Sequence, residues 1–378
     1  MKNYHAVCAA AVLTALPSSM FATSFLQTNL VSDLSTEGAV TVDPNLTNPW
    51  GMSYSATSPF WISNAASNNS TAYNGAGVAT TINVSVPGGP TGQVFNSAGA
   101  GNFVIPSNST AASFIFDTLS GGILAWNGPL GTTGTAATIT TTPGAVYTGL
   151  TLGNNGTGNY LYAANFTAGG GIQVFNSSFT NVTGTTFAGK FTDPNVPAGY
   201  APYNVQIIGN DLYVEYAEVG TSAGTAARGL GLGYVDVYDL NGNLVQRLIS
   251  GGNLDAPWGV TLAPAGFGQF GNDLLVGNFG NGEINAFDPT TGAYLGTLDG
   301  ANGNPIVNND LWAIDFRTNG GDSSNPDALY FDAGINGQKD GLFGDIAPAP
   351  EPSTYALAAL GLLASFAIGV MRRGRARQ

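Results

Sequence analysis

Four aromatic residues occupy the same place in four related segments of the chain and are the first candidates for chemistry. They are Trp50, Tyr203, Trp258 and Trp312, each early in a short apolar run. Aromatic ring faces stack on sugar rings, so a converging set of them predicts a wall of a ligand site. Large aromatic residues mostly serve protein cores, and we therefore favour the alternative that these rings pack between repeats.

A second set of polar residues stands where the next strand of each repeat is expected to end. Its members are Asn64, Asp117, Asn165 and Asn278, and Glu215 and Asp332 complete the set one residue earlier in their strands. Oxygen ligands of this kind suit calcium better than a transition metal, which makes a calcium-dependent hydrolase or lactonase the alternative enzyme hypothesis. Because every repeat carries the feature, whereas a catalytic site would be unique, we favour local capping of backbone groups by these side chains.

A third cluster lies near the end of the last repeat. Asp332, Asp340 and Asp345 surround Asn336 and Gly337, and this grouping is the better calcium candidate within the chain. Calcium is the only cofactor that the residues suggest, and no residue is predicted to be catalytic.

Composition excludes several functions. The only histidine, His5, and the only cysteine, Cys8, lie in the first residues, so the remaining body lacks a Ser-His-Asp or Cys-His nucleophile, a structural zinc site and a disulfide. Between the two terminal segments stand 22 acidic and 5 basic residues, a net charge near −17. Nucleic acid is thereby excluded as a partner, because phosphate binding needs the opposite charge.

The elements that position these residues are short strands in six similar units. Apolar and polar residues alternate with a period of two, and Gly, Asn and Asp mark the turns, as in Asn241-Gly242. Six such units around an axis predict an all-β, six-bladed β-propeller over residues 25–346. The last unit is one strand short, and residues 26–34 could supply that strand and close the ring. A β-sandwich, or two stacked β-domains, is the competing prediction.

Both ends of the chain have the pattern of targeting segments. Lys2 and the apolar stretch from Ala6 to Leu16 predict a signal peptide over residues 1–22. A linker over 347–353 precedes an apolar run at 354–371, which is long enough for a transmembrane helix, and four arginines follow within the basic tail 372–378. The positive-inside rule keeps that tail in the cytoplasm and everything before the helix on the exported side.

Pro350, Glu351 and Pro352, followed by one apolar helix and a terminal arginine cluster, resemble the PEP-CTERM sorting signal of exopolysaccharide-producing Gram-negative bacteria. The resemblance implies export, transient anchoring in the inner membrane and processing by an exosortase, after a signal peptidase has removed the N-terminal segment. The final location would then be the cell surface or the medium. A permanent single-pass anchor is the alternative.

The repeats resemble NHL-type propeller blades. The chain is similar to an uncharacterised family of bacterial PEP-CTERM-associated propeller proteins, through Asn48-Pro49-Trp50-Gly51, Ala256-Pro257-Trp258-Gly259 and Asp340-Gly341-Leu342-Phe343-Gly344. This resemblance implies a fold and no activity. We therefore expect a module that binds polysaccharide or protein, with a calcium-dependent enzyme as the alternative.

Overall fold

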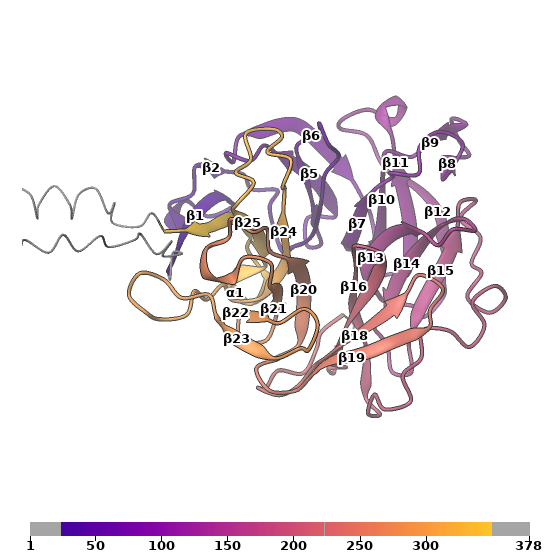
Figure 1. Cartoon of the computed structure of the whole chain (residues 1–378). Coiled ribbons are helices and arrows are strands. Elements are labelled where there is room, and N and C mark those ends of the chain that lie inside the picture. The colour runs from indigo at the N-terminus through magenta and orange to yellow at the C-terminus, as the bar shows by residue number, and fades with distance from the viewer. Residues whose placement is uncertain (1–23, 223, 350–378) are drawn as a thin grey trace, which may run out of the picture. The chain divides into compact units, whose positions relative to one another are not determined.

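The computed structural model describes residues 24–222 and 224–349, which form six β-sheets arranged as blades around one axis (Figure 1). The prediction of a six-bladed β-propeller is confirmed. In blades 1 to 5 the innermost strand comes first in the chain and successive strands step outward, whereas blade 6 takes its two outermost strands from the start of the chain.

The strands of the six blades have the following bounds. Blade 1 holds β3 (Pro49–Ser53), β4 (Phe60–Asn64), β5 (Asn69–Tyr73) and β6 (Ala79–Ser85), and blade 2 holds β7 (Pro90–Phe95), β10 (Phe114–Thr118), β11 (Gly122–Trp126) and β12 (Ala137–Thr141). Blade 3 holds β13 (Tyr147–Asn154), β14 (Asn159–Asn165) and β15 (Ile172–Asn176), and blade 4 holds β16 (Tyr200–Ile208), β17 (Asp211–Glu218), β18 (Tyr234–Asp239) and β19 (Leu244–Ser250). Blade 5 holds β20 (Pro257–Leu262), β21 (Leu274–Asn278), β22 (Ile284–Phe287) and β23 (Tyr294–Thr297), and blade 6 holds β24 (Leu311–Phe316), β25 (Leu329–Ala333), β26 (Leu342–Pro348), β1 (Phe25–Ser32) and β2 (Thr41–Val42).

The remaining elements are short. A two-stranded sheet joins β8 (Val104–Ile105) to β9 (Thr110–Ala111). Single turns of helix occur at η1 (Ser35–Glu37), η2 (Gly128–Leu130), η3 (Gly268–Phe270) and α1 (Ile335–Gln338).

The ring is closed by a strand from the start of the chain. Strand β1 pairs antiparallel with β26, from Phe25 opposite Pro348 to Ser32 opposite Leu342. The last blade thus receives the strand that the sequence lacks at that point, as predicted for residues 26–34. Phe25 packs against Phe267 and Phe270 of blade 5, so the closure also contributes apolar burial.

The core is divided among the interfaces between neighbouring blades. Six apolar clusters each lie between two successive blades, and a seventh lies on the axis. This division follows from strand alternation, because alternate side chains of a blade face its two neighbours. Every blade therefore depends on both neighbours for its buried surface.

A bulge recurs at the same place in all six blades. Pairing of the innermost strand with the second strand shifts near the start of each inner strand, for example between Pro202 and Asn204 and between Pro257 and Gly259. Bulges bend a strand and redirect its side chains, and they leave backbone groups without a ladder partner. Both effects shape the axial site.

Within residues 24–222 and 224–349 no helix is long and apolar enough to cross a membrane. The predicted signal peptide, the sorting helix at 354–371 and the basic tail lie outside the described residues.

Candidate functional site on the propeller axis

The six inner strands present their side chains to the axis in successive layers. When they are aligned on Trp50, the first position holds Trp50, Thr91, Thr148, Tyr203, Trp258 and Trp312. The next position holds Gly51, Gly92, Gly149, Asn204, Gly259 and Ala313, and two residues later stand Ser53, Val94, Thr151, Gln206, Thr261 and Asp315. We call these layers the plug, the neck and the cup.

The plug is a cluster of aromatic rings. Trp50 stacks on Trp312 with ring centroids 3.5 Å apart, and Trp258 meets Trp312 edge to face at 5.8 Å. Tyr203 lies 5.8 Å from Trp312, and Phe279 stacks on the same indole at 4.3 Å. The two threonines of this layer leave the space that the large rings fill, and Trp258 Nε1 donates a 3.0 Å hydrogen bond to the carbonyl oxygen of Thr148.

The four predicted aromatic residues are therefore brought together, but their faces contact one another. The exposed fraction of these side chains is at most 4%. Over the plug, the Arg228 guanidinium lies 4.3 Å from the Phe279 ring centroid and pairs with the buried Asp310. In this arrangement the rings stabilise the axis, and no ring face is open to a sugar.

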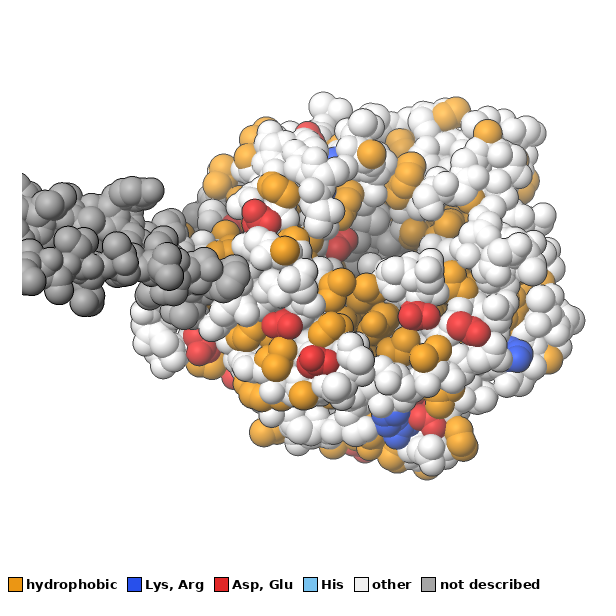
Figure 2. All heavy atoms as spheres, viewed as in Figure 1, with side chains coloured by type: hydrophobic (Ala, Val, Ile, Leu, Met, Phe, Trp, Pro, Cys, Tyr) orange, Lys and Arg blue, Asp and Glu red, His pale blue; other side chains and the backbone are white. Residues whose placement is uncertain are grey.

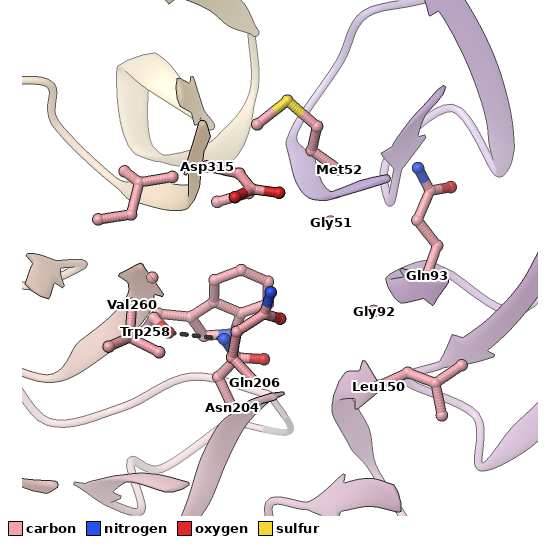
Figure 3. A pocket seen from close by; sticks show the side chains of 13 residues that line it. Gly51, Met52, Gly92, Gln93, Leu150, Asn204, Gln206, Trp258, Val260 and Asp315 are labelled. Atoms are coloured by element: carbon pink, nitrogen blue, oxygen red, sulfur yellow. Dashed lines mark hydrogen bonds between the residues drawn. The ribbon is translucent and has the colours of Figure 1, made fainter. Parts of the chain in front are cut away.

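The neck is narrow because its residues are small and the inner strands approach closely. A Cβ atom at Gly51 or Gly92 would collide with the backbone of the next inner strand, and one at Gly259 would lie 2.6 Å from the Trp312 carbonyl oxygen. Asn204 instead spans two blades, since its Nδ2 donates a 2.7 Å hydrogen bond to the Trp258 carbonyl oxygen (Figure 3). The cavity at this level measures about 30 Å³, which suits a water molecule and excludes a sugar.

The axis widens beyond the neck into the cup. This cavity measures about 290 Å³ and is lined by Met52, Ser53, Tyr54, Gln93, Val94, Phe95, Ser97, Leu150, Thr151, Gln206 and Asp315. Figure 3 shows the Asp315 carboxylate and the Gln206 amide directed into the central space. The Gln93 amide is turned toward blade 1, where its Oε1 accepts hydrogen bonds from Ser63 and Ser70 at 3.0 and 3.1 Å.

Asp315 is the one charged residue among those that line the neck and the cup. Its Oδ1 accepts hydrogen bonds from the Phe316 amide at 2.8 Å and from Thr261 Oγ1 at 3.3 Å. Burial raises the pKa of this carboxyl to about 6, against the lowering effect of these donors and of Tyr54. Asp315 is therefore largely ionised at neutral pH, in an oriented position on a partly enclosed surface.

The polar residues that the sequence grouped into one ring form two sets in the structure. Asp117, Glu215 and Asp332 lie opposite the bulges of blades 2, 4 and 6, where the other blades carry Ser63, Ala164 and Gly277. Asn64, Asn165 and Asn278 stand one residue later, opposite Pro49, Tyr147 and Pro257. The sequence placed Glu215 and Asp332 one residue earlier than the asparagines, as the structure does, but it grouped Asp117 with the asparagines, because the bulge hides the register of blade 2.

Members of both sets other than Glu215 bind local groups. The Asp332 Oδ1 accepts a 2.9 Å hydrogen bond from the Ala313 amide, and Asp117 Oδ1 accepts one of 2.8 Å from Thr91 Oγ1. The Oδ1 atoms of Asn165 and Asn278 accept from the backbone amides of Val146 and Asp255. These bonds are of the kind that the capping interpretation predicts.

The three acids opposite the bulges are fully buried. Burial raises the pKa of Asp117 to about 7 and raises those of Glu215 and Asp332 well above the usual range. Neither carboxyl oxygen of Glu215 has a hydrogen-bond partner among the described residues.

The predicted calcium cluster is not assembled. Asp332 lies inside the blade, Asp340 follows α1 and accepts a 2.9 Å hydrogen bond from Asn336 Nδ2, and Asp345 lies on β26 opposite Tyr330 and Thr28. In the described part of the chain, no three His, Cys, Asp or Glu side chains are grouped so that they could hold a metal ion.

A second cavity of about 400 Å³ lies beside blades 3 and 4, among Gly169–Gly171, Phe191, Asp193, Tyr200 and Tyr216. Its one acidic group, Asp193, is already paired with Arg247, and Lys190, which also lines it, donates a 2.8 Å hydrogen bond to Asn243 Oδ1. The cup differs in keeping its carboxylate free of a basic partner. Figure 2 shows acidic side chains in red outnumbering basic ones in blue on the face in view, in line with the net charge of the propeller.

Sequence reasoning missed the cup residues, although it had aligned the strands that carry them. Ser53, Gln206 and Asp315 stand three residues after the aromatic position in the repeats. A polar residue at that spacing in an otherwise apolar inner strand is the signal that could have found them.

A protein-family model matches the C-terminal end of the chain. The PEP-CTERM protein-sorting motif matches residues 348–375, which include Pro350, Glu351 and Pro352. The resemblance to PEP-CTERM proteins is confirmed, and the motif implies processing by an exosortase and a surface location.

Two solved structures with a similar arrangement are a hydrazine synthase of Kuenenia stuttgartiensis and a virginiamycin B lyase from Staphylococcus aureus. The first is 16% identical with a TM-score of 0.47 and covers 76% of this chain and 74% of its own. The second is 15% identical with a TM-score of 0.45 and covers 87% and 90%. Likenesses of this size carry no information on activity.

Two viral proteins from Acanthamoeba polyphaga mimivirus are similar over most of their length. Uncharacterized protein R648 is 32% identical over 334 residues, which cover 84% of this chain and 78% of the viral one. Uncharacterized protein L690 is 30% identical over 321 residues, which cover 80% and 81%. The chain therefore belongs to the family of propeller proteins that includes R648 and L690, and it carries a PEP-CTERM sorting motif at its C-terminal end.

Proposed function

We propose that this exosortase-sorted propeller is a non-enzymatic binding module for an extracellular polysaccharide, which it holds at the cup. The observation that carries the proposal is the cup itself: a cavity of about 290 Å³ on the axis, with an amide, hydroxyls and one carboxylate among apolar side chains. Ligand pockets combine these features, and this volume, at the low end of the roughly 300 to 1,000 Å³ range, fits one sugar unit.

The layout of the axis supports binding at one end. The plug and the neck close the channel, so a chain cannot thread through it, and the ligand is held from the cup side alone. Such a site suits a terminal sugar or a side branch of a polymer. The sorting motif supports an extracellular partner, because it resembles a signal of exopolysaccharide-producing bacteria.

The test is a glycan array probed with the purified full-length chain and with a variant whose cup is filled. Gln206→Trp places an indole in the cup, whereas Gln246→Trp places the same side chain on the exposed outer strand β19 of the same blade. We expect at least one polysaccharide to be retained by the wild type and by Gln246→Trp and to be lost with Gln206→Trp. Failure of the wild type to retain any glycan, or equal binding by both variants, would contradict the proposal.

A further inference from the structure

The negative charge of the cup limits the class of sugar that it can bind. Asp315 faces the cavity, and none of the four ion pairs among the described residues includes it. The nearest base along its strand, Arg317, is fully buried, with its guanidinium 5.0 Å from the Tyr54 ring centroid and directed to the carbonyl oxygens of Ser55 and Ala56. The guanidinium of Arg317 is therefore bound behind the wall of the cup, and the carboxylate of Asp315 has no basic partner among the described residues.

Each class of ligand meets this carboxylate differently. A neutral sugar would cover Asp315 and remove its water without supplying an opposite charge, which is unfavourable. A uronic acid would be repelled by Asp315 and by a propeller with 22 acidic and 5 basic residues. A ligand with an ammonium group would form a charge-assisted hydrogen bond with the carboxylate and be attracted by the same net charge.

The remaining groups of the cup fit a sugar ring. The side-chain amide of Gln206 has no hydrogen-bond partner among the described residues, and the Ser53 hydroxyl is buried without a partner. The Gln206 amide can bond to ring hydroxyls, while Met52 and Phe95 supply apolar surface for a ring face. The cup is too wide to grip a single extended lysine side chain on all sides.

We propose that the cup binds an amino sugar whose nitrogen is not acetylated, with the ammonium group on Asp315 and ring hydroxyls on Gln206. This inference rests on the proposed polysaccharide-binding function and specifies its ligand. It predicts a preference for a partly or fully deacetylated hexosamine polymer over its acetylated form.

Isothermal titration of the full-length chain with a glucosamine tetrasaccharide and an N-acetylglucosamine tetrasaccharide tests the inference. We expect the free amine to bind about tenfold or more tightly than the acetylated form. The variant Asp315→Asn should lose that preference, whereas Asp345→Asn, which changes a partly buried carboxyl of blade 6 outside the cup, should keep it. Thermal melts of both variants establish that they are folded, and Gln206→Leu provides a second cup variant expected to weaken both ligands.

Three results would overturn the inference. One is equal binding of the two tetrasaccharides, and another is an unchanged preference in folded Asp315→Asn. The third is equally tight binding of a trilysine peptide, which would indicate a cationic protein partner. Binding of acetylated or neutral glycans that is still blocked by Gln206→Trp would leave the proposed function standing while the inference fails, and the absence of any glycan binding would remove both.

Discussion

Replacement of Asp117 by Asn should make the propeller markedly less sensitive to alkaline pH. Asp117 is fully buried, its Oδ1 accepts a hydrogen bond from Thr91, and its Oδ2 has no partner among the described residues. Burial raises its pKa from 3.8 to about 7, so the folded state binds a proton that the unfolded chain has released above pH 4. Asn keeps the acceptor for Thr91 and removes the ionisation.

The direction and size of this pH effect follow from the linkage between proton binding and unfolding. Because the folded protein binds more protons, the free energy of unfolding is highest below the unfolded pKa and falls as the pH rises through the folded pKa. With one pKa unit equal to about 1.4 kcal/mol, Asp117 alone accounts for a loss of at most about 4 kcal/mol over the whole range. Between pH 5 and pH 8 its share is about 2 to 3 kcal/mol.

Urea unfolding of wild type and Asp117→Asn at pH 5 and pH 8 measures this effect. The variant should gain stability relative to the wild type by about 2 to 3 kcal/mol between the two pH values. The control is Asp288→Asn, because Asp288 lies in a partly exposed turn and its pKa is lowered by the amide and hydroxyl of Thr291 and by the Thr290 amide. That control should show no change between pH 5 and pH 8. A stability difference for Asp117→Asn that is the same at both pH values would refute the reasoning.

Other predictions concern closure of the ring by β1, the aromatic plug and the C-terminal sorting motif. Phe25→Ala should lower the free energy of unfolding by about 3 to 5 kcal/mol in urea, whereas Leu26→Ala, on the same strand and 58% exposed, should change it by about 0.5 kcal/mol or less. Equal effects would contradict closure by β1. Trp312→Ala should cost a similar 3 to 5 kcal/mol, about tenfold more than Leu295→Ala at the exposed outer edge of blade 5, and a tolerated Trp312→Ala would contradict a packed plug. Pro350→Ala with Glu351→Ala should leave the chain at its precursor size on an immunoblot of the producing cells, and unchanged processing would argue against exosortase recognition of these residues.

The fold was accessible from the sequence because the repeated unit is local. Strands β4, β21 and β25 begin and end where alternation and turn residues place them, and the missing outer strand of the last blade indicated a closing strand near residue 26. Strands β14 and β17 extend beyond their apolar residues, because their pairing continues to Asn159 in β14 and to Glu218 in β17.

The candidate site was harder to predict from the sequence, because each inner strand carries a bulge. One extra residue on the inner strand shifts the facing register, so Asp117 and Asn165 look equivalent in the sequence but stand one residue apart in the blades. The same bulge sets which side chains reach the axis beyond the neck, and this placed Asp315 and Gln206 in the cup. The aromatic residues drew attention by size, yet their burial follows from the two threonines that share their layer.

The methyl group of Met52 offers the most direct test of binding at the cup. The four methionines of the chain are Met1, Met20, Met52 and Met371, so Met52 alone lies within the propeller, and it lines the cup. In a protein with carbon-13 methionine methyl groups, titration with the glycan retained on the array should shift the Met52 resonance in a saturable way. A glycan that binds tightly while the Met52 resonance stays unchanged would place the ligand elsewhere and contradict the account.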